Sequence, residues 1–169
     1  EMKLKLFVGS IVFLLVASAC GFNVNLSSNT ITGSGKRVTE TRAVSGFDEV
    51  VLAGSGELYI EQGQDEALTV ETDDNVMRYV KTEVQGSSLV LGFKDNVSVS
   101  LNQPIIFRLT VRDLTSVTLA GSGKVAAKAL DTDKLTINLP GSGDMTFDKV
   151  DTIKLHATIA GSGNITIGD

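Results

Sequence analysis

Apolar and polar residues alternate on both sides of a repeated Gly-Ser-Gly triplet. Copies of the triplet begin at Gly33, Gly54, Gly121, Gly141 and Gly161, and the last three are spaced by 20 residues. In the last four copies, the positions four and two before the first glycine and four and six after it are all apolar. They are Val50, Leu52, Leu58 and Ile60; Val117, Leu119, Val125 and Ala127; Ile137, Leu139, Met145 and Phe147; and Ala157, Ile159, Ile165 and Ile167. A period of two residues is typical of strands with one buried face, so each repeat is predicted to be strand, corner, strand.

A period near 20 residues that is built from strands alone predicts an all-β solenoid over residues 31–169. Equivalent side chains of successive coils would then lie about 4.8 Å apart. Glycine suits a corner because it tolerates positive φ and close backbone approach. We therefore expect structural corners at Gly54, Gly56, Gly121, Gly123, Gly141, Gly143, Gly161 and Gly163. A flexible linker would lack the alternating flanks, and a phosphate loop would open a helix and carry Lys-Ser or Lys-Thr.

The period is lost between residues 61 and 114, although strand patterns continue there. Strands are predicted at residues 68–70, 79–84, 89–93, 97–101 and 105–111, with a turn at residues 85–88. This section is expected to form longer, irregular coils or a small antiparallel sheet. Residues 73–75, Asp-Asp-Asn, are predicted to cap a short helical turn.

The two ends of the pattern are atypical. The triplet at Gly33 fits the repeat only in part and is expected to form a capping half-coil. The chain stops at Asp169, shortly after the last triplet. We expect the last coil either to continue beyond this residue or to have its edge covered by a partner.

The N-terminal segment predicts export and lipid attachment. Lys3 and Lys5 precede an apolar run over residues 6–17, which is too short for a comfortable membrane span and resembles a signal peptide over residues 1–19. Cys20 is the only cysteine. Small residues followed by Cys resemble the lipobox of bacterial lipoproteins, although Ala17 replaces the usual Leu. We expect Cys20 to carry acyl chains that hold the protein on a membrane, with residues 20–30 as a tether; a plain signal peptide with a chance cysteine is the alternative.

Composition excludes some partners. The 150 residues after the signal peptide suit one domain. A net charge of −5 and the absence of a basic, aromatic groove argue against nucleic acid. Seven Phe, two Tyr and no Trp leave few stacking platforms for sugars, which weakens the case for carbohydrate recognition.

Few residues carry candidate chemistry. His156 is the sole histidine; without a nucleophile and an orienting carboxylate beside it, it is interpreted as a solvated surface residue. Asp131, Asp133 and Asp151 form an acidic group, and Asp131 and Asp151 would stack about 5 Å apart, as the acids of retaining glycosidases do. Three interpretations of this acidic group stay open: residues that favour turns, a weak Ca²⁺ site, and catalysis. No cofactor is expected.

Several of these features together resemble one bacterial family. They are the run Val-Ser-Gly-Phe-Asp-Glu-Val over residues 44–50, the triplet at Gly54, the section from Glu71 to Phe93, Pro104-Ile105 and the later triplets. Over about residues 31–169, the chain resembles the putative auto-transporter adhesin, head GIN domain family. The resemblance implies a right-handed parallel β-helix at the cell envelope and no transferable catalytic or binding residues. The family's adhesin label is an analogy of fold.

The sequence therefore predicts a non-catalytic, lipid-anchored protein of the cell envelope that acts in adhesion or in envelope organisation. Its expected partners are the membrane, through the lipid, and a cell-surface glycan or an envelope protein. One alternative is a polysaccharide-acting enzyme that uses Asp131 and Asp151 as acids. Another is an envelope-stress accessory protein.

Overall fold

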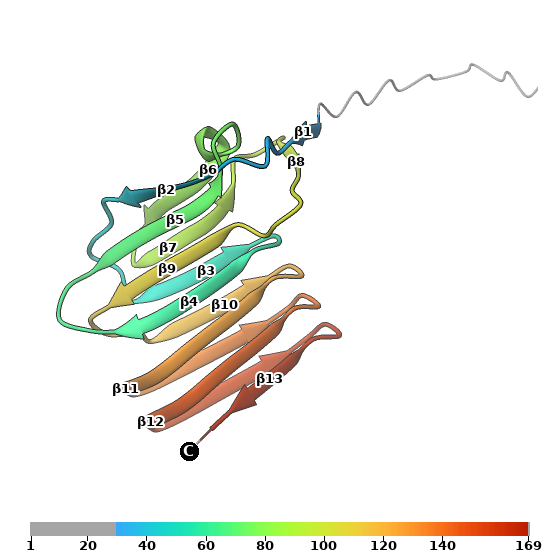
Figure 1. The fold of residues 1–169 in the computed structure, drawn as a ribbon. Helices are drawn as coiled ribbons and strands as arrows, with labels where there is room; N and C mark the ends of the chain where they lie inside the picture. The colour runs from blue at the N-terminus through green and yellow to red at the C-terminus, as the bar shows by residue number, and fades with distance from the viewer. Residues whose placement is uncertain (1–29, 169) are drawn as a thin grey trace, which may run out of the picture.

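The computed structural model describes residues 30–168, which form strands and one short 3-10 turn (Figure 1). The strands are β1 (Thr30–Thr32), β2 (Arg37–Arg42), β3 (Glu49–Ala53), β4 (Glu57–Gln62), β5 (Ala67–Asp73), β6 (Val80–Gln85), β7 (Ser88–Phe93), β8 (Ser98–Ser100), β9 (Ile106–Val111), β10 (Ser116–Ala120), β11 (Lys124–Leu139), β12 (Asp144–Ile159) and β13 (Asn164–Ile167), and the turn is η1 (Met77–Tyr79). The predicted signal peptide, Cys20 and the tether before Thr30 lie outside the described residues. Within residues 30–168, no helix is both long and apolar enough to cross a bilayer.

The strands form one large mixed sheet of eleven strands, and β1 and β8 pair separately. The order along the main path is β2-β5-β9-β4-β11-β10-β3-β7-β6, and β12 and β13 continue from β11. Pairs β2–β5, β5–β9 and β6–β7 are antiparallel. The prediction of a right-handed parallel β-helix over residues 31–169 is therefore wrong. The all-β class is right, but the sheet is mixed, nearly closed and barrel-like.

Each antiparallel pair includes at least one strand from the section where the twenty-residue period is lost. A tight turn at Gly86, which has a φ of +65°, returns β7 directly beside β6. A two-residue turn joins antiparallel neighbours, whereas parallel neighbours need a longer crossover. The short connection therefore imposes the reversed direction of β6 and β7, whereas β2–β5 and β5–β9 join strands far apart in the sequence. These pairs agree with the alternative of a small antiparallel sheet.

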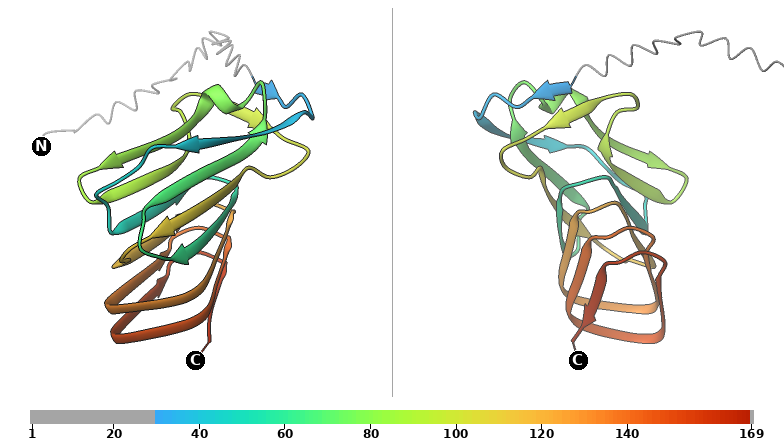
Figure 2. Two further views of the ribbon diagram at one scale, coloured as in Figure 1. Left: turned by 60° about the vertical axis from the view of Figure 1, so that its left-hand side comes forward. Right: turned by 90° about the vertical axis from the view of Figure 1, so that its right-hand side faces the viewer.

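The sheet folds into two facing walls because β11 and β12 are long and pass from one wall to the other. Residues 124–127 of β11 pair with β4, and residues 136–138 pair with β10. Strands β11 and β12 pair in parallel with an offset of 20 residues, so that Val125 lies beside Met145 and Leu139 beside Ile159. Figure 2 shows the two walls facing each other, with the C-terminal strands stacked at one end.

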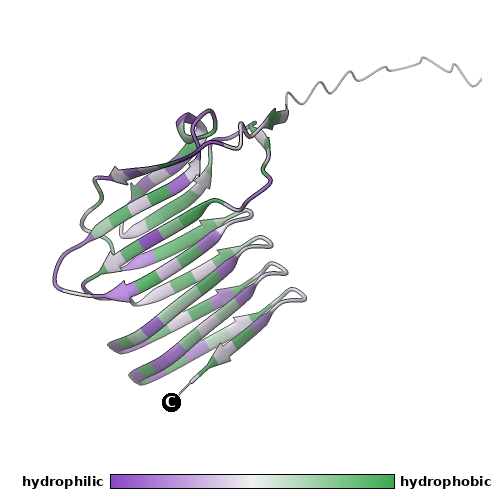
Figure 3. Ribbon diagram, viewed as in Figure 1, coloured by the Kyte–Doolittle hydropathy of each residue, from purple (hydrophilic) through white to green (hydrophobic). Residues whose placement is uncertain are grey.

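The core fills the space between the walls. The inward positions of β3, β4, β9, β10 and β11 are almost fully buried, and Figure 3 shows the matching alternation of apolar and polar bands along the strands. Leu119 and Leu139 are 0% exposed, whereas Ile159, which pairs with Leu139, is 49% exposed. The apolar columns thus run through the molecule and emerge at its C-terminal end.

The triplet glycines at this end pack backbone against backbone. A Cβ added at Gly141 would overlap the carbonyl oxygen of Gly121, and one at Gly161 would overlap that of Gly141. Gly54 differs, because its φ is +106° and a Cβ there would meet open space. Glycine is therefore needed for two different reasons along this row of turns: there is no room for a Cβ at Gly141 and Gly161, and the backbone conformation is left-handed at Gly54.

The first triplet makes contacts of another kind. Ser34 Oγ donates to Asp74 Oδ1 at 2.6 Å, Gly35 N donates to Asp73 Oδ2 at 2.9 Å, and Ser34 N donates to Asn75 Oδ1 at 2.9 Å. The helical turn predicted after residues 73–75 is present as η1, but these residues do not cap it, since its N-cap is Val76 and no side chain caps it. The acidic turn instead holds the loop between β1 and β2.

Candidate binding face around Tyr59 and Arg108

The outward residues of one wall line up across its strands, because pairing brings equivalent positions side by side. Arg108 of β9 pairs with Thr69 of β5 on one side and with Tyr59 of β4 on the other. Tyr59 pairs in turn with Ala126 of β11, which pairs with Thr146 of β12. These five residues and their outward neighbours are called the Tyr59 face below.

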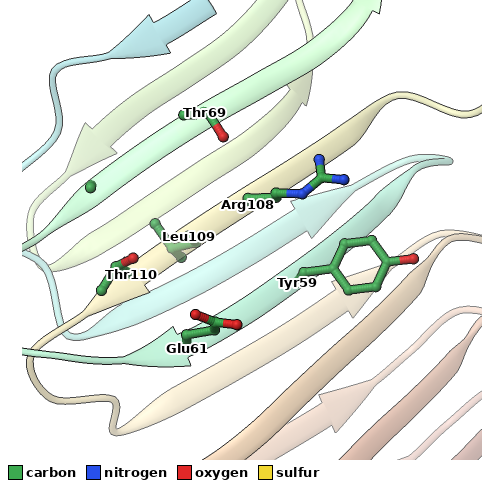
Figure 4. A pocket seen from close by; sticks show the side chains of 7 residues that line it. Tyr59, Glu61, Thr69, Arg108, Leu109 and Thr110 are labelled. Carbon is green, nitrogen blue, oxygen red and sulfur yellow. The ribbon is translucent and has the colours of Figure 1, made fainter. Parts of the chain in front are cut away.

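A shallow hollow of about 300 Å³ lies on this face between β4 and β5. Figure 4 shows Tyr59 and Arg108 along one part of it, and Glu61 and Thr110 along another. Its lining residues are Tyr59, Glu61, Ala67, Thr69, Arg108, Leu109 and Thr110. The hollow therefore combines an aromatic ring, a guanidinium, a carboxylate and two hydroxyls on rigid strands.

Arg108 is held by weak contacts that leave it accessible. Its guanidinium carbon lies 5.9 Å from the centroid of the Tyr59 ring. Its Nη1 lies 3.4 Å from Glu71 Oε2, while Glu71 Oε1 lies 3.3 Å from Nη2 of Arg37. The Arg108 side chain is 57% exposed. Exposed ion pairs contribute little to stability, so this guanidinium is positioned yet free to bind another anion or hydroxyl.

Tyr59 has a fixed orientation because its hydroxyl donates to Glu57 Oε2 at 2.6 Å. This hydrogen bond to Glu57 is the largest cause of a raised Tyr59 pKa; burial and the negative charge of Glu57 raise it further, and Arg108 opposes them. The phenol therefore stays neutral at physiological pH. Glu57 holds the ring with one face toward the hollow's arginine.

A second hollow of about 220 Å³ adjoins Tyr59 on its other side. Lys128 and Glu61 border it and form an ion pair of 2.6 Å between Nζ and Oε1. The hydrogen bond from Lys128 to Glu61 raises the pKa of the lysine, and both side chains are more than half exposed. The Tyr59 face thus offers fixed charges of both signs around one aromatic ring, an arrangement suited to polar ligands.

The acidic residues predicted as alternative chemistry lie elsewhere. Asp131 and Asp151 are register partners on β11 and β12, as their spacing predicts, and both border a hollow of about 360 Å³ with Lys149. Gln62 clamps this corner, since its side chain accepts from Asp131 N at 2.7 Å and donates to Asp131 O at 2.9 Å. Among residues 30–168, no three His, Cys, Asp or Glu side chains are grouped to hold a metal ion.

His156 lies on the outward side of the other wall. It is exposed, and its Nε2 lies 3.2 Å from Thr158 Oγ1. Within the described part of the chain, its ring has no other side-chain hydrogen bond or ion pair. The interpretation as a surface histidine agrees with this position.

Sequence reasoning missed the Tyr59 face. Glu57, Tyr59 and Glu61 alternate with buried residues, so their outward direction could be read from the sequence. The contact with Arg108 could not be read from the sequence, because it depends on the pairing of β4 with β9, whose partner residues are 49 positions apart in the chain. Tertiary structure alone brings Arg108 beside Glu57, Tyr59 and Glu61, which share one strand.

The fold and this face define an all-β protein that presents rigid, polar strand surfaces. Its family follows from the comparisons: the model of the putative auto-transporter adhesin, head GIN domain family matches residues 46–168. The chain belongs to this family, which confirms the resemblance seen in the sequence. No functionally curated protein matches the sequence significantly.

Solved structures share the fold at low identity. A putative adhesin from Bacteroides fragilis matches with a TM-score of 0.75 and 23% identity, over 80% of this chain and 63% of that one. A protein from Parabacteroides distasonis described as a putative lipid binding protein matches with a TM-score of 0.68 and 24% identity, over 82% and 69% of the two chains. A putative adhesin from the same organism matches with a TM-score of 0.66 and 23% identity, over 83% of this chain and 68% of that one. This chain thus spans less than two thirds of the Bacteroides fragilis protein.

Proposed function

We propose that this protein is a non-catalytic binding protein of the cell envelope, anchored by lipid at Cys20, whose Tyr59 face engages a cell-surface glycan. Membership of an adhesin-like family supports binding as the general role. The observation that carries the proposal is the hollow beside Tyr59, where an aromatic ring, a guanidinium, hydroxyls and a carboxylate stand on neighbouring strands. Sugars are bound by such sets, since a ring packs on their C–H face while polar groups accept or donate around it.

The side chains of Tyr59 and Arg108 are already oriented before a ligand binds. Tyr59 is held by Glu57, and Arg108 is held between the ring and Glu71. A ligand therefore pays little to order these side chains. A hydroxylated or carboxylated sugar unit would pack on Tyr59 and accept hydrogen bonds from Arg108, with Glu61 accepting from its hydroxyls.

The test is a glycan array, followed by calorimetry on any hit, with a soluble Cys20→Ser protein. Tyr59→Ala and Arg108→Ala should each weaken binding at least about tenfold, the equivalent of about 1.4 kcal/mol. Arg78→Ala is a matched control, because Arg78 lies 5.7 Å from the ring of Tyr79 in a similar pair away from the face. Binding that survives both face variants, or that is lost equally in the control, would refute this assignment.

One observation favours a second candidate, an enzyme that acts on polysaccharides. Asp131 and Asp151 are adjacent in register, and Lys149 borders the same hollow. We expect no cleavage of a polysaccharide panel by the parent protein. Activity in the parent that disappears in Asp131→Asn with Asp151→Asn would replace the binding proposal with this one.

A further inference from the structure

Arg108 is the cation that lines the hollow beside Tyr59, and one edge of its guanidinium is free. Its Nη1 donates to Glu71 Oε2 at 3.4 Å. In the part of the structure that spans residues 30–168, Nε and Nη2 of Arg108 make no hydrogen bond or ion pair. These two nitrogens form the edge of a guanidinium whose parallel N–H bonds match the two oxygens of one carboxylate.

A second arginine of this region already uses the same edge on a carboxylate. Arg37 donates from Nε at 3.4 Å and from Nη2 at 3.3 Å to Glu71 Oε1. Glu71 is therefore shared between two arginines, and its stronger attachment is to Arg37, which gives it two nitrogens. A ligand that takes the place of Glu71 at Arg108 leaves Glu71 paired with Arg37, so no carboxylate loses its last cation.

The two outward carboxylates of β4 are also engaged by neighbours. Glu61 forms its ion pair of 2.6 Å with Lys128. Glu57 accepts from the Tyr59 hydroxyl at 2.6 Å and lies beside Lys124 in register. An anion that enters the hollow thus meets carboxylates that have partners and one guanidinium with a free edge. This distribution of charge favours a ligand with a carboxylate of its own.

We propose that the hollow selects sugars that carry a carboxylate, such as uronic and sialic acids, a specificity that rests on the glycan binding proposed above. In these sugars the carboxylate is attached directly to the ring. One sugar unit can therefore pack its C–H face on Tyr59 and give both carboxylate oxygens to Nε and Nη2 of Arg108. Thr69 and Thr110, which also line the hollow, supply hydroxyls for the hydroxyl groups of the sugar.

The test compares acidic oligosaccharides with their methyl esters, which keep the sugar and lose the charge. Trigalacturonic acid, sialyllactose and a hyaluronan tetrasaccharide, each with its ester, are titrated into the Cys20→Ser protein by calorimetry. At least one acid should bind about tenfold more tightly than its ester, because hydrogen bonds to a charged group are stronger than those to a neutral one.

Arg108→Lys separates the guanidinium edge from positive charge alone, because lysine keeps the cation and lacks the parallel N–H bonds. This variant should reduce the preference for acid over ester to about twofold or less. Arg78→Lys is the matched control, since Arg78 is an exposed arginine beside the ring of Tyr79 and does not line the hollow. In NMR of isotope-labelled arginine, the Nε–H resonance that is missing in Arg108→Lys should shift with the acid and stay in place with the ester.

The outcomes separate this specificity from the function on which it rests. Esters bound as tightly as their acids, or neutral glycans bound while all three acids are not, would overturn the selection of carboxylates and leave the proposed glycan binding in place. Binding of no glycan at all would overturn both. A preference for the acid that persists in Arg108→Lys, or that is lost equally in Arg78→Lys, would overturn the role given to Arg108. Far-UV circular dichroism checks that each variant is folded.

Discussion

Gly141→Ala tests how tightly the triplet turns are packed. The added Cβ would overlap the carbonyl oxygen of Gly121. That oxygen is backbone and cannot swing aside as a long side chain could. It also accepts from Ser142 N at 2.9 Å and from Gly143 N at 3.2 Å. The substitution therefore pushes apart two layers exactly where their hydrogen bonds hold them together.

The magnitude can be worked from these contacts. Overpacking of a tight site costs about 1–3 kcal/mol, and weakening one or two hydrogen bonds costs about 1 kcal/mol each. Alanine restricts the unfolded chain more than glycine does, and this effect stabilises the folded state by about 0.4–1 kcal/mol. The net loss is about 1–5 kcal/mol, centred near 3 kcal/mol, a large part of the 5–15 kcal/mol typical of a domain.

Urea unfolding followed by circular dichroism measures this loss. With a slope of about 2 kcal/mol per molar urea, the central loss of about 3 kcal/mol should lower the midpoint by about 1.5 M. Ser142→Ala is the matched control, since it changes an exposed residue of the same triplet and adds no atom. Gly54→Ala should cost about 1–2 kcal/mol through its φ of +106° alone. Equal midpoints for Gly141→Ala and Ser142→Ala would refute the packing argument.

Three further predictions concern single groups. The pKa of Tyr59 is raised in the folded state, so its hydrogen bond to Glu57 should stabilise the fold fully below the unfolded pKa of about 10 and lose this effect as pH rises through the folded pKa. Ultraviolet titration of the phenol should show a lower Tyr59 pKa in Glu57→Ala than in the parent protein. An unchanged Tyr59 pKa would contradict the role given to Glu57. The pKa of Asp74 is lowered chiefly by the hydrogen bond from Ser34. The stability that this hydrogen bond contributes is therefore present above the unfolded pKa of about 3.9 and is lost as pH falls through the lower folded pKa. Carboxyl NMR should show a higher Asp74 pKa in Ser34→Ala, whereas an unchanged Asp74 pKa would exclude the contact. Metabolic labelling with an alkyne fatty acid should tag the protein through Cys20 and fail in Cys20→Ser, and an unlabelled parent would remove the lipid anchor from the proposed function.

Much of the strand content can be read from the sequence. The predicted strands at residues 68–70, 89–93 and 105–111 lie within or largely overlap β5, β7 and β9. The direction of pairing could not be read in the same way. A strand in a parallel coil and a strand in a hairpin show the same alternation of apolar and polar residues. This alternation depends only on the strand's own backbone, so it does not indicate the direction of the neighbouring strand. The turn at Gly86 and the placing of β5 between β2 and β9 decided the mixed sheet.

The sequence by itself determined which side chains face inward, because a strand alternates its sides whatever lies next to it. It also determined the offset of β11 and β12, since twenty-residue repeats match only in that register. Tertiary structure decided which strands became neighbours and in which direction. It thereby brought Tyr59 and Arg108 together, because this contact joins residues that are far apart in the chain.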